Sequence, residues 1–244
     1  MYVDFARLYA LLKEDAILSY KLMSRLFCEP LSPRARLWAG ERAVMLLDYG
    51  LHLFGEEGEL DRFLADLEPG EYSLFAVPVK YLPVLEKHFA EIHREEDTTA
   101  YTLAPGQFSG PEAEELDSLT VADAEFVDAH WTYRHEGSLE FFRRILAELP
   151  SSAVRIDGQL AGWAVCYDRV DDMVNLGSLR VLEPYRRRGL GRKLALDLVK
   201  KVLARGWTPL IHIVDSNTAS KNLSMGIGFK PYPEKIFWGR GIKK

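Results

Sequence analysis

One segment, "LRVLEPYRRRGLGRKLALDLV" at residues 179–199, constrains the fold more than any other part of the chain. A short apolar strand at 179–182 leads into a loop of arginines and glycines, and a helix with one apolar stripe follows over 189–204. Glycine lets the backbone approach a ligand closely, and the amides at a helix N-terminus point outward toward anions. Arginine adds charge-assisted hydrogen bonds to phosphate oxygens. The segment therefore predicts a turn that binds a pyrophosphate.

The bulk properties make this arginine run a local feature. The chain has 244 residues and a formal net charge of −5, which argues against general binding to nucleic acid or to an anionic membrane. Neither a GxxxxGK[ST] loop nor a GxGxxG motif after an N-terminal strand is present. The alternative to a phosphate site is a solvated basic patch, and Arg187 in particular could be solvated surface.

Other function classes find little support. Two cysteines are too few for a disulfide framework, and the six histidines show no metal-ligand spacing, so we expect no metal site. The sequence contains neither a basic signal segment at its start nor a long apolar stretch, which favours a cytoplasmic protein without membrane contact.

The periodicity predicts an α/β protein with two domains. An N-terminal α/β domain is expected over 1–110, a linker rich in glycine, proline and acidic residues over 111–118, and a second domain over 119–244. In the first domain we expect helices over 4–27, 58–67 and 80–93, and strands over 42–55, 72–78 and 98–105.

The second domain has the clearer pattern. The predicted order is ααβββαβαβ, a mixed central sheet flanked by helices. Ser138 is the expected N-cap of the second helix, and Asp157-Gly158 is the expected turn of a hairpin. The predicted elements are helices over 121–131, 138–149, 189–204 and 218–228, a hairpin over 153–170, and strands over 172–182, 209–215 and 235–241.

Two motifs carry a resemblance to a known superfamily. "RRRGLG" resembles the [RQ]xxGx[GA] pattern of the GCN5-related N-acetyltransferases (GNATs), and "NTASKNLSMGIGFKPY" resembles the late helix of that fold. The resemblance implies an acyl-CoA co-substrate, with acetyl-CoA first among the candidates. Its pyrophosphate would lie on the arginine loop, and its pantetheine and thioester carbonyl on the backbone of the preceding strand. The residues so implied are Leu179, Arg180 and Val181 on the strand, Arg186, Arg187, Arg188, Gly189, Leu190, Gly191 and Arg192 in the loop and helix start, and Asn217 and Ser220 in the late helix.

A narrower resemblance is to the glycine N-acyltransferase group. "HIVDSNTASKNLSMGIGF", the tryptophan in "DAHWTY" and the helix "SLEFFRRILAELPSSAV" resemble its C-terminal half. That group carries an N-terminal half of degenerate, related fold, which implies a degenerate GNAT-like domain over residues 1–110. The N-terminal half is shorter here than in the group, so its role stays open.

The resemblance also implies candidates for catalysis. The group places a glutamate early on the strand before the arginine loop, and Asp172 stands at about that place. Asp171, Glu183 or an ordered water are alternatives for the base, and a plain hairpin turn is an equal alternative for Asp172. Many GNATs use a late-helix tyrosine as the acid. Here that position is Ser224, whose hydroxyl could equally bond the helix backbone, and Tyr232 is a nearby substitute.

The resulting expectation is an N-acyltransferase, with acetyl transfer as the first case, that moves an acyl group from CoA to the primary amine of a small molecule or amino acid. Trp131 could line the acceptor pocket or belong to the core, and His212 lies in an apolar strand as a core or cleft residue. We expect a monomer or homodimer. The alternative is an acyl-CoA-binding sensor or structural module without turnover.

Overall fold

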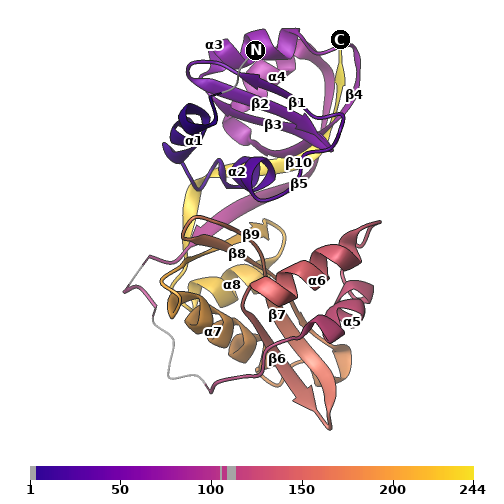
Figure 1. Ribbon diagram of the computed structural model, residues 1–244, viewed down its shortest axis with the longest axis vertical. Coiled ribbons are helices and arrows are strands. Elements are labelled where there is room, and N and C mark those ends of the chain that lie inside the picture. The colour runs from indigo at the N-terminus through magenta and orange to yellow at the C-terminus, as the bar shows by residue number, and fades with distance from the viewer. Residues whose placement is uncertain (1–3, 105, 109–113) are drawn as a thin grey trace. The chain divides into compact units, whose positions relative to one another are not determined.

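The computed structural model describes residues 4–104, 106–108 and 114–244, which form two compact units (Figure 1). The first unit runs to Ala100 and takes in 213–217 and 231–244, and the second holds 101–212 and 218–230. The compact units differ from the predicted domains because the last strand pairs with the first unit. The division at 111–118 therefore stays a prediction, and residues 111–113 of that linker lie outside the described residues.

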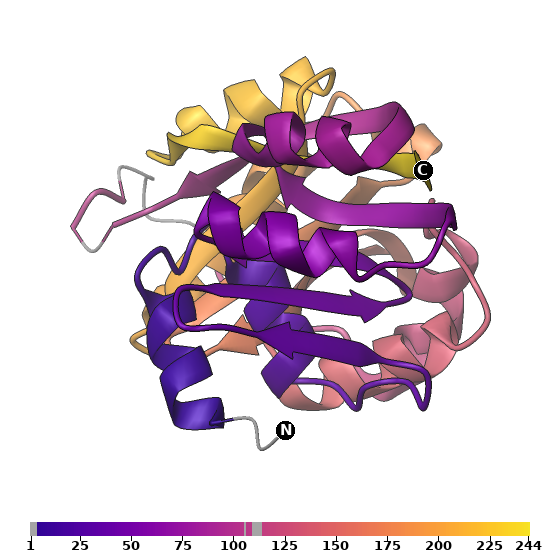
Figure 2. The same cartoon turned by 90° about the horizontal axis from the view of Figure 1, so that it is seen from above.

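The first unit is a mixed sheet with helices on both faces. Its strand order is β1-β2-β3-β4-β10-β5. The elements are α1 Phe5–Lys13, α2 Tyr20–Phe27, β1 Arg36–Ala39, β2 Ala43–Asp48, β3 Gly50–Gly55, α3 Glu57–Ala65, β4 Gly70–Pro78, α4 Leu82–His88, β5 Phe89–Thr102 and β10 Lys230–Lys243. Met45 and Leu53 pack in one core with residues of α3 and α4, whereas Arg25 of α2 pairs with buried Asp48 at the end of β2. Figure 2 looks onto this unit, where helices flank the β2–β3 hairpin.

Most predicted elements of this unit are present, with two errors. The helix predicted over 80–93 ends at His88, and Phe89 begins a 14-residue strand that extends the strand predicted over 98–105. The short strand β1 was not predicted at all. The other predicted segments, including two helices in 4–27 and strand pieces in 42–55, match the structure.

The second unit is a four-stranded sheet, ordered β9-β8-β7-β6, with helices on both faces. The elements are α5 Ala124–Ala129, α6 Ser138–Glu148, β6 Ser151–Ile156, β7 Gln159–Val170, β8 Met173–Val181, α7 Leu190–Leu203, β9 Thr208–Val214 and α8 Thr218–Met225. With β10 as the last element, this is the predicted order ααβββαβαβ. Trp163 and Val165 pack with α5 and α6, whereas Leu194 of α7 approaches Gly162 on the other face.

The prediction that Ser138 is the N-cap of α6 is wrong, because Ser138 is the first residue of the helix. Gly137 holds the cap position with φ +89°, a left-handed conformation that glycine adopts without strain. The Ser138 hydroxyl instead bonds to the buried carboxylate of Asp128 on α5 and so ties the two helices together.

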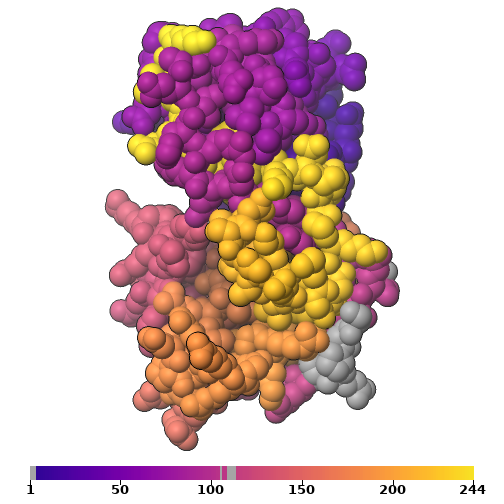
Figure 3. All heavy atoms as spheres, turned by 180° about the vertical axis from the view of Figure 1, so that it is seen from behind, coloured from indigo at the N-terminus to yellow at the C-terminus, as the bar shows by residue number. Residues whose placement is uncertain are grey.

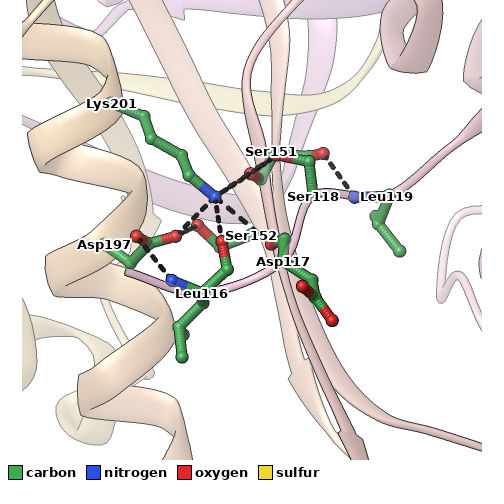
Figure 4. Close-up of polar contacts among 8 residues, drawn as sticks. All are labelled: Leu116, Asp117, Ser118, Leu119, Ser151, Ser152, Asp197 and Lys201. Carbon is green, nitrogen blue, oxygen red and sulfur yellow. Dashed lines mark hydrogen bonds and ion pairs between the residues drawn. The ribbon is translucent and has the colours of Figure 1, made fainter. Parts of the chain in front are cut away.

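A buried polar cluster in the second unit fixes residues 116–119, the segment before α5 (Figure 4). The Lys201 ammonium on α7 donates to the carbonyl oxygens of Leu116, at 2.8 Å, and Ser151, at 3.1 Å. Asp197, one turn earlier, accepts from the Leu116 amide at 3.1 Å and from the Ser152 hydroxyl at 2.5 Å. These contacts join α7, β6 and the incoming chain, so the helix that begins at the arginine loop is held in place at its far end.

None of the helices in the described part of the chain is long and apolar enough to cross a membrane.

Candidate functional site

The arginine loop connects the end of β8 to the start of α7, as the sequence predicts. A 3₁₀ turn at Glu183–Tyr185 follows the strand, and Arg186 then continues in an extended conformation. Arg187 has φ +61° and Gly189 has φ +74°, so the chain makes two left-handed steps before the helix. A left-handed conformation costs a residue with a side chain about 1–2 kcal/mol. Arg187 adopts it all the same, so the loop has one defined backbone conformation.

The loop ends at the N-terminus of a 14-residue helix. The amides of Arg192 and Lys193 donate to the Gly189 carbonyl at 3.1 and 3.2 Å. The amides of Leu190 and Gly191 come before these first intrahelical bonds, and amides in that position are the ones that a helix leaves for an external acceptor. Together with the helix dipole they form a site suited to an anion.

Four exposed arginines surround this turn. The Arg186 Nε donates to the Val181 carbonyl at 3.1 Å, and the Arg188 guanidinium donates to the Pro184 carbonyl at 3.1 Å and lies over the Tyr185 ring. These two arginines thus brace the loop backbone and keep their remaining N–H groups near it. Arg187 is exposed, with no hydrogen bond or ion pair recorded for its side chain in the described part of the chain, which fits either phosphate contact or solvation.

The end of β8 packs against the start of α7. A Cβ placed on Gly191 would lie 3.6 Å from the Leu179 side chain and 3.9 Å from that of Val181. The structure therefore brings the predicted strand residues and the predicted helix start together. Leu179 keeps 41% of its surface exposed, which is unusual for a leucine of a central strand and leaves an apolar edge beside the anion site.

β8 and β9 pair over only part of their length. Their parallel ladder runs from Met173↔Thr208 to Leu176↔Ile211, whereas β8 itself continues to Val181. Amides of β8 beyond Leu176 are therefore not used by this ladder. We call the point where the ladder ends the strand fork.

A backbone irregularity in β8 lies just past the strand fork. Ser178 has φ +42°, and the register with β7 shifts by one residue between the pairs Val165↔Gly177 and Trp163↔Arg180. This is a β-bulge, which inserts an extra residue and re-aims the backbone groups around it. A non-glycine residue at positive φ within a strand is strained, and such strain gathers at functional sites.

An aromatic cluster lies over the bulge. The Tyr167 ring covers Gly177 so closely that a Cβ there would clash at 2.0 Å. The Trp131 indole donates to the Tyr167 hydroxyl at 3.1 Å and packs against Phe141 and Phe142. Burial raises the pKa of Tyr167 to about 12, so its phenol stays protonated. Trp131 is thus part of a packed cluster, and its contact with an acceptor stays a prediction.

Asp172 lies away from the strand fork. It is exposed in the two-residue turn that joins β7 to β8, and its carbonyl and carboxylate accept from the amide and hydroxyl of Thr208. From Asp172 to Val181 at the end of β8 is about 30 Å at the usual rise of a strand. The structure does not bring Asp172 together with the arginine loop, and its role as base stays a prediction. Asp171 shares the turn with φ +53°, and Glu183 is exposed in the loop itself.

Ser224 is buried near the end of α8, where its carbonyl accepts from the amides of Ile227 and Phe229. α8 ends close to the start of α7, because a Cβ on Gly226 would lie 3.5 Å from the Arg192 guanidinium. In Figure 3 this part of the chain is coloured orange to yellow. Ser220 lies in the first turn of α8 and so on the helix that borders the arginine loop.

Two other predicted residues belong to the first unit. The Tyr232 hydroxyl, the alternative acid, donates to Asp15 at 2.8 Å, and burial with this bond raises its pKa to about 12. The Asn217 amide closes a turn onto the Val214 carbonyl at 2.8 Å. The roles proposed for Asn217, Ser220 and Ser224 stay predictions.

Sequence reasoning missed two residues at the strand fork, namely Ser178 and Asn175, whereas it expected His212 to be a core or cleft residue. The buried Asn175 amide oxygen lies 3.2 Å from His212 Nδ1 across the β8–β9 ladder. A polar pair inside two apolar strands was the available signal, but their register was not readable from sequence. Among the residues that the structure describes, no group of three histidine, cysteine or acidic side chains could hold a metal ion.

Comparison with known proteins supports the resemblance to the GNAT superfamily. A family model described as "FR47-like protein" matches residues 155–238, which run from the end of β6 into β10. A Drosophila protein is 22% identical, with a TM-score of 0.68 over 96% of this chain and 88% of the other.

Two solved structures carry the superfamily's name. A GCN5-related N-acetyltransferase from Kribbella flavida is 16% identical over 91% of this chain and 95% of the other, with a TM-score of 0.60. A GNAT-family acetyltransferase from Colwellia psychrerythraea is 14% identical over 93% and 97%, with a TM-score of 0.59. The chain therefore has the GNAT fold, as predicted. The narrower resemblance to the glycine N-acyltransferase group stays a prediction.

Proposed function

We propose that this chain is an acyl-CoA-dependent N-acyltransferase, acetyl transfer being the first case, that acylates the primary amine of a small molecule or amino acid. The observation that carries the proposal is the combination of the arginine turn at the start of α7 with the strand fork at the bulge of β8. One feature suits the pyrophosphate of CoA, and the other offers backbone groups for the rest of that molecule.

The charge and polarity of the residues around the arginine turn support the proposal. The Leu190 and Gly191 amides with the exposed guanidinium groups of Arg186 and Arg188 would hold the pyrophosphate. The exposed Leu179 side chain gives an apolar edge for the pantetheine chain beside that site. Amides of β8 past the strand fork that the β8–β9 ladder does not use would bind the pantetheine amides in the manner of an added strand.

Acyl transfer from a thioester needs a neutral amine, a donor for the carbonyl oxygen and a leaving thiolate. The thioester supplies an activated acyl group with a good leaving group. A backbone N–H of β8 past the strand fork would stabilise the carbonyl oxygen as charge develops, because a fixed donor aimed at that atom needs no reorganisation. The protein's further contribution is to hold the amine in line with the carbonyl carbon.

The test is thiol release from acetyl-CoA in the presence of single amines, namely glycine, ethanolamine, spermidine and tryptamine, with the acetylated product identified by mass. The proposal expects release that depends on one kind of amine. Binding of CoA without release across the panel would favour the alternative, a CoA-binding module without turnover. No binding of CoA at millimolar concentration would contradict both.

A further inference from the structure

A histidine stands where the β8–β9 ladder ends. His212 directly follows Ile211, whose ladder partner is Leu176, so His212 occupies the first position past the strand fork. It is half-buried, and its neighbours on both sides in β9, Ile211 and Ile213, are apolar. The next residue of β8, Gly177, lacks a side chain, and the bulge at Ser178 follows directly.

A contact with a neighbouring amide bears on the tautomer of this histidine. His212 Nδ1 lies 3.2 Å from the Asn175 Oδ1 atom, and an Nδ1–H would donate to that oxygen. In the neutral imidazole the lone pair then lies on Nε2, on the opposite side of the ring. Asn175 is 3% exposed, so its side chain is held by packing.

The pair lies on the face of the sheet that carries the aromatic cluster. Asn175 and Gly177 share a face of β8, because alternate residues of a strand point the same way, and Tyr167 covers Gly177 on that face. α7, with the arginine turn at its start, packs on the opposite face against Gly162. An amine that approaches the bulge from the side of Tyr167 would therefore meet His212 rather than the phosphate site.

We propose that His212 is the general base of the acylation, with Asn175 as the residue that holds its tautomer. This inference rests on the proposed function. In the step, the amine nitrogen bonds to the carbonyl carbon, and the proton that it loses passes to His212 Nε2. The C–S bond breaks, the thiolate leaves, and the imidazolium returns that proton to the sulfur. The products are an amide and a thiol, and the imidazole ends neutral.

The first test does not depend on turnover. Nitrogen-15 NMR of the imidazole signals, with His212→Gln to assign the resonance, reports which ring nitrogen carries the proton. The proposal expects the Nδ1–H tautomer in the wild type and its loss in Asn175→Leu, whereas Asn175→Asp keeps an acceptor and keeps the tautomer. A wild-type Nε2–H tautomer overturns the proposal.

The second test uses thiol release with the amine that the wild type prefers in the panel above. His212→Gln should lower kcat/KM by about 100-fold or more, the usual worth of a general base, while the CoA-induced rise in melting temperature stays. Imidazole added to His212→Ala should restore amide formation in a saturable way. The control is His93→Gln, an exposed histidine of the first unit, which should match the wild type.

The outcomes separate the two proposals. If His212→Gln keeps its activity within about threefold of the wild type, the base assignment is overturned and the acyltransferase proposal stands. The same follows if His212→Ala loses activity that added imidazole does not restore. A wild type that is silent with every amine overturns the acyltransferase, and the base assignment falls with it.

Discussion

The ammonium of Lys201 lies 2.8 Å from the Asp197 carboxylate, one turn earlier on α7, and only 4% of the Asp197 side chain is exposed. Both ions also bond to the backbone of Leu116, in the segment before α5 (Figure 4). A buried pair of this kind costs desolvation but is expensive to break, since removing one partner leaves the other charge uncompensated.

Lys201→Met should therefore destabilise the protein by about 3 kcal/mol, within the range for breaking a buried ion pair. The matched control is Lys193→Met on the same helix, whose partner Glu114 is largely exposed and whose loss should cost about 0–1 kcal/mol. Urea unfolding of both variants measures the difference. Equal stability of the two variants would show that the cluster does not anchor α7.

His52 gives the first unit a pH dependence. Burial, followed by the nearby Arg25 charge, lowers the pKa of this buried histidine to about 3. Because the unfolded chain binds the proton at its ordinary pKa of 6.5 and the folded chain does not, stability falls as the pH drops from about 6.5 toward 3.

This term amounts to about 2 kcal/mol between pH 7 and pH 5. His52→Phe keeps a ring beside Phe75. Between pH 7 and pH 5 its free energy of unfolding should fall by about 2 kcal/mol less than that of the wild type. His93→Gln removes an exposed histidine and should leave the wild-type slope. Urea unfolding at the two pH values makes the comparison, and parallel slopes for wild type and His52→Phe would contradict it.

The two glycines of the arginine turn should respond differently to alanine. Gly189 has φ +74°, so Gly189→Ala should cost about 1 kcal/mol or more through backbone strain although space is open around it. Gly191 has no such φ, and a Cβ there meets only ordinary contacts, so Gly191→Ala should be neutral or stabilising. Thermal unfolding of the two variants decides. A lower stability for Gly191→Ala than for Gly189→Ala would refute this account of the turn.

The sequence predicted the second unit better than the first for physical reasons. The arginine turn is a local object, since strand, loop and helix are consecutive, and its glycine positions follow from backbone conformation. The end of α4 was mispredicted because "FAEIHREEDTTAYT" carries many charges and its Phe89 and Ile92 stand at helical spacing. Strand pairing between distant segments overrides that local preference.

The strand fork could not be predicted from sequence. It depends on where the β8–β9 ladder stops, and the Asn175–His212 contact joins residues 37 positions apart. The bulge at Ser178 carries no glycine at the position with positive φ, so composition gives no sign of it. Asp172, by contrast, occupies the turn between β7 and β8, which the sequence itself offered as the alternative to a role as base.

The central claim is that the arginine turn binds the pyrophosphate of CoA. Isothermal titration with CoA should give one site, and Arg186→Ala with Arg188→Ala should weaken it by about tenfold or more, since each lost charge-assisted bond is worth about 1.5–3 kcal/mol. The matched control removes two exposed arginines of α6, Arg143→Ala with Arg144→Ala, and should bind CoA as the wild type does. Equal affinity of both double variants, or no heat of binding for the wild type at millimolar CoA, would contradict the claim.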